Sequence, residues 1–266
     1  DGYSSYSNSS INVTDNVQIN AQLTDYAPAV DFESPTPSDG TSITETSVYV
    51  NASSSDSGNV STFIDFDGSL VSWWRMDDYN STNVHDYTGR NNLTIVGDAS
   101  YTASGKMGGA FEFENNDYLI KSTYEFSNSS IGSVAAWVKA STGTHIFSVD
   151  TSSGGVYVWF YMGSSGNIYF YKRGTGGSGG DSVVASTTIN LNDSMWHHIA
   201  VTSNDTSYFI YIDGVADPIG WTSGNGNSGD WFGDLNYTIN GIRIGRNGNS
   251  LIDDVMIFNR SLLAAE

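Results

Sequence analysis

The chain contains no cysteine among its 266 residues, and only 10 of them are Lys or Arg. The missing cysteine excludes disulfides, thiolate metal sites and a cysteine nucleophile. With 29 acidic residues the formal net charge is −19, which repels phosphate backbones and anionic membranes and makes nucleic acid a poor partner. No stretch reaches the roughly 18 apolar residues of a membrane span. A charged n-region followed by an apolar run is also missing at the start, so a secreted form of this chain would already be the mature one.

What the chain does contain favours β-structure. Hydrophobic residues make up 38% and aromatic residues 13%, and the polar remainder is mostly Ser, Thr, Asn and Gly. From about residue 67 to residue 266, short apolar or alternating runs are separated by Gly, Asn, Ser and Asp turns. This regular spacing predicts an all-β domain, an antiparallel β-sandwich of the jelly-roll type.

The segment before residue 67 has a different character. Residues 1–36 are predicted to form an extended arm that ends in a proline-rich linker, and residues 37–66 a short β linker or a reduced sandwich segment. Within the arm, apolar residues alternate with polar ones, which predicts a long strand with one apolar face: Ile11, Val13, Val17, Ile19, Ala21 and Leu23.

An exposed strand of this kind must be paired to avoid aggregation. It pairs either within its own subunit or with the next copy of the chain, and the second case would give an open head-to-tail filament. The first hypothesis for function is therefore a non-catalytic, self-assembling subunit of an extracellular surface filament or layer, with other copies of itself as partners.

Residues 196–214, "WHHIAVTSNDTSYFIYIDG", raise the question of a histidine site. Alternation places His197 and His198 on opposite faces of a strand, so the two cannot bind one metal ion. The segment predicts a β-hairpin with structural histidines.

This hairpin also resembles the central hairpin of the laminin-G-like, concanavalin A-like jelly-roll domains. The resemblance extends in order over roughly residues 67–266 and includes the segments "LVSWWRMDD", "DYTGRNNLTIVGD", "GKMGGAFEFENNDYLI", "GSVAAWVKA" and "LIDDVMIFNRSLLAAE". The polar, aromatic lead-in resembles that of large surface proteins of prokaryotes, archaea included. The resemblance implies an extracellular, cell-surface β-sandwich for glycan or protein recognition, often with a structural Ca²⁺.

The same resemblance implies where a calcium ion would be held. In the family, an Asp after the opening strand lies close to an Asp of the final strand. The matching positions are Asp77 and Asp253, with Asp78 and Asp254 beside them, and ordinary turn or edge aspartates are the alternative.

Catalysis is not expected. The Glu-x-Asp-x-x-Glu motif of glycosidases with this fold is missing, and Glu112 and Glu114 have no second acid placed by a motif. A cryptic glycoside hydrolase is the weakest of the three functional hypotheses, and no catalytic residue is named.

The second hypothesis is a glycan-binding adhesion module. The predicted hairpin at 155–173 has one aliphatic face for the core, and its other face is an aromatic platform for a ligand or partner. Loops or the N-terminal region could instead cover that face. The candidates are Tyr157, Trp159, Tyr161, Tyr169, Tyr171 and Arg173, with Trp221 and Trp231 of loop 219–235 as a rim.

Sequons for N-linked glycosylation are frequent, which supports an extracellular glycoprotein. They fall at Asn8, Asn12, Asn51, Asn59, Asn80, Asn92, Asn128, Asn192, Asn204, Asn236 and Asn259.

Overall fold

The computed structural model describes residues 29–38, 41–42, 51–55, 68–122, 129–151, 155–174, 182–235 and 238–263. The chain divides into two compact units, residues 1–65 and residues 66–266. The alternating strand predicted at residues 11–23 lies outside the described residues, as do the apolar positions Ile11, Val13, Val17, Ile19, Ala21 and Leu23.

The first unit contains a small antiparallel sheet. Strand β1 (Ala29–Glu33) pairs with β2 (Asn51–Ser55), and the Thr36 hydroxyl donates to the Asn51 carbonyl oxygen at 2.8 Å. The proline-rich end of the arm predicted at residues 1–36 therefore contains a paired strand. The prolines at positions 28, 35 and 37 stand outside β1, so the segment Ala29–Glu33 keeps every N–H that a strand needs.

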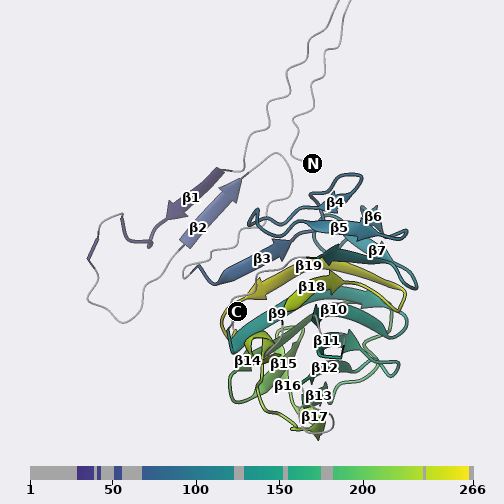
Figure 1. The fold of residues 1–266 in the computed structure, drawn as a ribbon. Coiled ribbons are helices and arrows are strands. Elements are labelled where there is room, and N and C mark those ends of the chain that lie inside the picture. Colours follow the sequence, from purple (N-terminus) through teal and green to yellow (C-terminus); the bar gives the residue numbers. More distant parts are fainter. Residues whose placement is uncertain are drawn as a thin grey trace, which may run out of the picture. The chain divides into compact units, whose positions relative to one another are not determined.

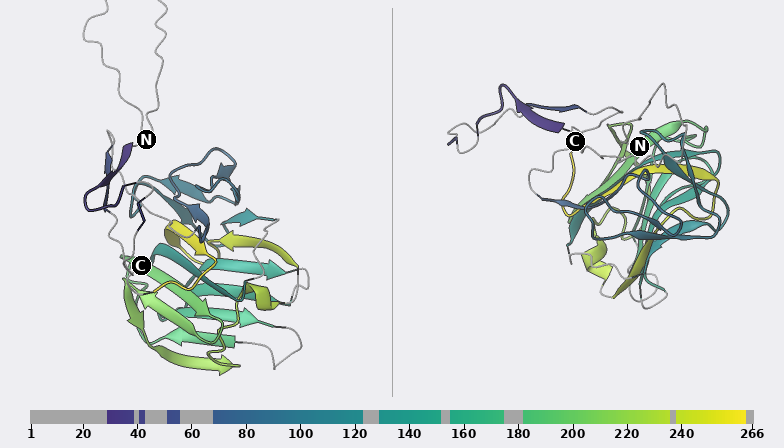
Figure 2. Two further views of the ribbon diagram at one scale, coloured as in Figure 1. Left: turned by 90° about the vertical axis from the view of Figure 1, so that its left-hand side faces the viewer. Right: turned by 90° about the horizontal axis from the view of Figure 1, so that it is seen from above.

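The second unit is built from two antiparallel sheets, which Figures 1 and 2 show as stacked layers. Within the described residues, one sheet has nine strands in the order β17 (Ile219–Gly224), β13 (Ser182–Ser186), β12 (Ile168–Arg173), β11 (Tyr157–Met162), β10 (Thr144–Thr151), β18 (Ile239–Ile244), β8 (Tyr118–Lys121), β5 (Leu93–Val96) and β4 (Asn83–Val84).

The other sheet has eight described strands. Their order is β16 (Val215–Asp217), β15 (Tyr208–Ile212), β14 (Trp196–Asn204), β9 (Ile131–Ala140), β19 (Ser250–Phe258), β7 (Ala110–Phe113) and β6 (Ser100–Thr102), and β3 (Leu70–Trp74) pairs with β19. One short 3₁₀ helix, η1 (Phe232–Leu235), precedes β18. The predicted all-β sandwich is confirmed. No helix in the described part of the chain is long and apolar enough to cross a bilayer.

A single large hydrophobic core fills the space between the sheets. It is made by alternate residues of facing strands, for example Val158, Phe160 and Phe170 from the nine-stranded sheet and Val134, Ile199 and Ile257 from the other, all at most 1% exposed. The partners of these residues along each strand point outward, so the alternation that built the core also determines which side chains the outer faces present.

The hairpin predicted at residues 196–214 is formed by β14 and β15, and both histidines contact neighbouring side chains. His197 lies between two carboxylates, with Nδ1 2.9 Å from Asp213 and Nε2 3.3 Å from Asp193. The His198 ring packs 5.2 Å from Trp137 of the neighbouring strand β9.

The two ends of the second unit lie side by side. The last strand β19 pairs with β3, the first, and the Asn259 N–H donates to the Ser69 carbonyl oxygen at 3.0 Å. The aspartates that follow β3 and those within β19 are therefore brought to one region of the sandwich.

Close packing in this core gives a first prediction. Substituting Gly132→Ala in β9 should lower the free energy of unfolding by about 1–3 kcal/mol. The added Cβ would overlap the Trp231 indole and lie 2.9 Å from the Phe258 carbonyl oxygen. Urea denaturation measures the loss, with the exposed substitution Ser104→Ala as the control; an unchanged midpoint for Gly132→Ala would contradict this packing.

Candidate functional site

The outward face of strands β11 and β12 carries a continuous group of aromatic side chains. Along β11 the inward residues are buried and the outward ones are half-buried, so Tyr157, Trp159 and Tyr161 face away from the core. The register pairs Tyr157 with Arg173, Trp159 with Tyr171 and Tyr161 with Tyr169. The structure thus places all six residues predicted from this hairpin on one face, called here the aromatic platform.

The rings of the platform pack against each other. Tyr157 and Trp159 are stacked with their centroids 4.1 Å apart, and Tyr171 stands edge-on to both, at 5.5 and 5.9 Å. Tyr161 and Tyr169 form a second, nearly parallel stack at 4.9 Å. These contacts hold the rings in fixed orientations, which lowers the entropy lost when a ligand binds.

The sequence analysis missed one member of the platform, His145 of β10. Its ring lies 5.1 Å from Trp159 and 5.5 Å from Tyr161 and so joins the two stacks. Burial, with the nearby Arg246 charge as a second cause, lowers the pKa of His145 to about 4. At neutral pH it therefore acts as an uncharged aromatic ring.

A shallow hollow opens on this face. It has a volume of about 500 Å³ and is lined by Tyr161, Tyr169, Tyr171 and Val183, within the range of small-molecule sites. Burial, together with the nearby Tyr169 and Tyr157, raises the pKa of Tyr161, so its hydroxyl stays protonated and can donate.

Charged groups lie beside the hollow rather than in it. The Arg173 guanidinium sits 5.7 Å from the Tyr157 ring centroid and donates to the Tyr157 hydroxyl at 3.3 Å. On the neighbouring strands, Arg243 forms an ion pair with Asp150. The hollow itself presents aromatic surface and tyrosine hydroxyls.

Trp221 and Trp231, predicted to form a rim in a loop at residues 219–235, do not both lie in a loop. Part of the expected loop 219–235 is strand β17, in which Trp221 pairs with Ala185 of β13. Trp231 is a core residue, 2% exposed and stacked 5.3 Å from Phe170 and 4.4 Å from Phe232. Its indole folds inward because Gly132 leaves room for it, a long-range effect that a Gly- and Asn-rich loop sequence does not reveal.

Two of the four aspartates predicted to bind calcium, Asp77 and Asp253, contact the loop at residues 105–109, and a third, Asp254, contacts Trp73. Asp77 accepts from the Gly109 N–H at 2.6 Å, and one oxygen of Asp253 accepts from the Lys106 and Met107 N–H groups at 2.9 and 3.0 Å. Asp254 accepts from the Trp73 indole at 2.7 Å. These carboxylates fix the loop and the last strand to the start of the unit.

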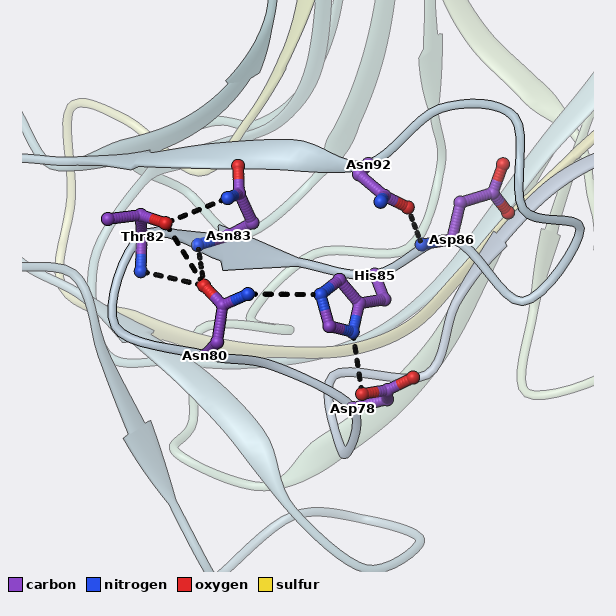
Figure 3. A network of polar contacts seen from close by, with 7 residues as sticks. All are labelled: Asp78, Asn80, Thr82, Asn83, His85, Asp86 and Asn92. Carbon is purple, nitrogen blue, oxygen red and sulfur yellow. Dashed lines mark hydrogen bonds and ion pairs between the residues drawn. The ribbon is translucent and has the colours of Figure 1, made fainter.

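Asp78 does not join them. Figure 3 shows its carboxylate directed at His85, whose Nδ1 lies 2.7 Å away, while His85 Nε2 lies 3.2 Å from the Asn80 amide nitrogen. The part of the chain that the structure describes contains no group of three acidic or histidine side chains arranged to hold a metal ion. Asp77, Asp253 and Asp254 each accept from N–H groups on one oxygen, and these contacts do not decide whether the set binds calcium, which stays a prediction.

The buried carboxyl groups of β19 have raised pKa values. The second Asp253 oxygen is buried and has no hydrogen-bond partner. Burial, with Asp254 and Asp77 nearby, raises the pKa of Asp253 to about 7, and burial raises that of Asp254 to about 6. Deprotonation of Asp253 and Asp254 thus places two negative charges next to each other in a buried site, where both burial and mutual repulsion oppose ionisation.

These shifts predict how stability depends on pH. Folded Asp253 holds a proton that the unfolded chain releases near pH 4, so its contribution to stability is present below that pH and is lost as the pH rises through 7. Asp253→Asn should therefore gain stability relative to the natural chain between about pH 4 and 7, by up to about 4 kcal/mol.

Urea denaturation at a series of pH values in buffer with EDTA measures this difference, so that no divalent cation competes with the proton. Asp205→Asn is the matched control, since Asp205 lies in an exposed turn. A constant difference between Asp253→Asn and the natural chain across this range would contradict the prediction.

Comparison with solved structures identifies the same fold in other proteins. The chain matches domain 4 of an extracellular arabinanase from Geobacillus stearothermophilus, solved with arabinotriose, at 20% identity and a TM-score of 0.57, covering 74% of this chain and 95% of that domain. A botulinum neurotoxin type C structure, described as dependent on two ganglioside molecules for cell entry, matches at 17% identity and a TM-score of 0.55, with 74% and 49% covered. A Trypanosoma rangeli sialidase matches at 16% and 0.53, with 74% and 31% covered.

No curated protein matches the chain by sequence. A family model does: the concanavalin A-like lectin/glucanases superfamily model called Laminin_G_3 matches residues 113–266, more than half of the chain. The confirmed two-sheet architecture and this match lead to one conclusion. The chain belongs to the concanavalin A-like lectin/glucanases superfamily.

Proposed function

We propose that the chain is a non-catalytic glycan-binding module of an extracellular protein and that the aromatic platform holds the glycan. The observation that carries this proposal is the hollow of about 500 Å³ whose lining includes three tyrosines, Tyr161, Tyr169 and Tyr171. Sugars present apolar C–H faces and a rim of hydroxyls, and tyrosine offers both a ring face and a polar tip.

The chemistry of the lining supports binding rather than hydrolysis. A glycosidase needs two carboxyl groups across the scissile bond, and none of the four lining residues carries one. Glu112 of β7 is exposed and belongs to the opposite sheet.

Two further observations support the proposal. The arabinanase domain was solved with arabinotriose and the neurotoxin depends on gangliosides, so the fold carries glycan recognition elsewhere. The arabinanase is extracellular, which agrees with the many sequons here. The filament hypothesis depends on residues 11–23, outside the described part of the chain; the described side chains support glycan binding instead.

Substituting Tyr171→Ala should weaken glycan binding by roughly tenfold, the loss expected for one aromatic contact of about 1–1.5 kcal/mol. The probe is an array that includes arabinan oligosaccharides and sialylated glycans, followed by titration calorimetry with the glycan retained best. Tyr87→Ala removes a 70% exposed tyrosine outside the platform and serves as the matched control. Equal affinities for the two variants, or no glycan retained by the natural chain, would contradict the proposal.

Binding should also weaken as the pH falls toward 4. His145 is neutral above its lowered pKa of about 4; below it, an imidazolium would form beside Trp159, Tyr161 and the Arg246 charge. His145→Phe keeps an aromatic ring without a titratable group, so its affinity should stay level between pH 6 and 4, while that of the natural chain falls about twofold as half of His145 becomes protonated. Parallel pH profiles for both proteins would show that His145 plays no part.

A further inference from the structure

The described residues contain six of the chain's sequons. These six differ in the contacts made by the Asn side chain and by the hydroxyl two residues later. N-linked glycosylation needs the side-chain nitrogen of Asn and the hydroxyl two residues later to be accessible together. The six are Asn51, Asn80, Asn92, Asn192, Asn204 and Asn259; Asn8, Asn12, Asn59, Asn128 and Asn236 lie outside the described residues.

Two of these sequons, at Asn80 and Asn204, each form a turn with the same pattern of hydrogen bonds. The Asn204 side-chain oxygen accepts from the Thr206 N–H at 3.1 Å, the Thr206 hydroxyl at 2.8 Å and the Ser207 N–H at 2.9 Å. Asn80 does the same with the Thr82 N–H at 2.9 Å, the Thr82 hydroxyl at 3.1 Å and the Asn83 N–H at 2.9 Å. Both asparagines and both threonines are exposed, so each turn presents nitrogen and hydroxyl at one tip.

At Asn51 and Asn192 the amide nitrogen is bonded to another segment of the chain. The Asn51 nitrogen donates to the Ser34 carbonyl oxygen at 3.2 Å, and the Ser53 hydroxyl donates to Glu33 at 2.9 Å. The half-buried Asn192 donates to the Ser164 carbonyl oxygen at 3.1 Å. Glycosylation at either site must break a contact that holds two segments together.

At Asn92 and Asn259 other contacts hold the sequon. The Asn92 oxygen accepts from the Asp86 N–H at 2.9 Å, and its threonine, Thr94, lies within strand β5. The hydroxyl that belongs to Asn259 is Ser261, which is bonded to the buried Thr202 hydroxyl at 2.8 Å. Asn92 and Thr94 are exposed, but the Thr94 hydroxyl donates to the Asn83 side chain at 3.4 Å, so contacts of both groups must open before they can react together. At Asn259 the Ser261 hydroxyl must first leave Thr202.

Asn80 and Asn204 differ in one respect. The Asn80 nitrogen lies 3.2 Å from His85 Nε2. The Asp78 carboxylate, 2.7 Å from the other ring nitrogen, favours the tautomer in which Nε2 accepts a hydrogen bond. Figure 3 shows this chain of contacts from Asp78 through His85 to Asn80. His85 therefore holds the nitrogen that would have to react.

We infer that Asn204 is the principal N-glycosylation site among the described sequons and that His85 restrains the otherwise equivalent site at Asn80. In the reaction, the Asn204 nitrogen forms a bond to C1 of an activated sugar while the bond between C1 and a phosphate oxygen breaks. The phosphate leaves with the electron pair, and one amide proton passes to a base of the transferase that brings the donor.

The position of Asn204 is compatible with an open platform. It is the last residue of β14, at the turn to β15 in the eight-stranded sheet, whereas the platform belongs to β10, β11 and β12 of the other sheet. A glycan at Asn204 is therefore attached away from the strands that form the hollow, and this inference holds whether or not the platform binds glycans.

The experiment is the secretion of the full chain from an N-glycosylating eukaryotic host, followed by glycopeptide mass spectrometry of the folded protein. Occupancy at Asn204 should exceed that at Asn51, Asn92, Asn192 and Asn259 by about tenfold, the factor expected when one or two hydrogen bonds must first open. Asn80 should be intermediate. Short peptides with the six sequences, glycosylated by the same transferase, control for sequence preference.

His85→Ala is the second arm, because it removes the partner of the Asn80 nitrogen and leaves the sequon intact. Occupancy at Asn80 should rise to the level of Asn204, while Asn204 itself stays unchanged; Thr206→Ala confirms the assignment by abolishing modification at Asn204 alone. The inference is overturned if the four restrained sequons are occupied as fully as Asn204, or if His85→Ala leaves Asn80 unchanged.

Discussion

The alternation of side chains along strands β11 and β12 joins the hydrophobic core to the aromatic platform. One face of this hairpin supplies Val158, Phe160 and Phe170 to the core, each 0% exposed. Because neighbouring residues point to opposite sides, the same backbone must present Tyr157, Trp159, Tyr169 and Tyr171 outward. Core formation thus determines which rings face outward. A one-residue slip in register would disrupt both the core and the platform.

The sequence revealed those parts of the fold that follow from regular alternation. The strands of the second unit, the hairpin at 196–214 and six platform residues obey a period of two, and the structure places them accordingly. His145 was not predicted as a platform residue because a β-bulge between His145 and Phe147 shifts the register of β10 against β11. Such a bulge depends on pairing with β11, which composition does not encode.

Other features depended on contacts distant in sequence. Trp231 is buried because it stacks on Phe170 and meets Gly132, residues 61 and 99 positions away. Asp77 and Asp78 are adjacent, yet one contacts the loop at 105–109 and the other contacts His85. The buried Met76 before them has a φ of 60° and turns the chain at this point. Family resemblance located the aspartates, but only the structure shows what each one accepts.

We propose the outer face of the nine-stranded sheet as the surface that binds the glycan. Backbone amide chemical shifts, followed by NMR during titration with the glycan retained best on an array, would locate the binding surface. The account predicts that the perturbed amides cluster in β10, β11, β12 and β13, around Tyr161, Tyr171 and Val183. Perturbations confined to the opposite sheet, around Trp137 and His198, would contradict it.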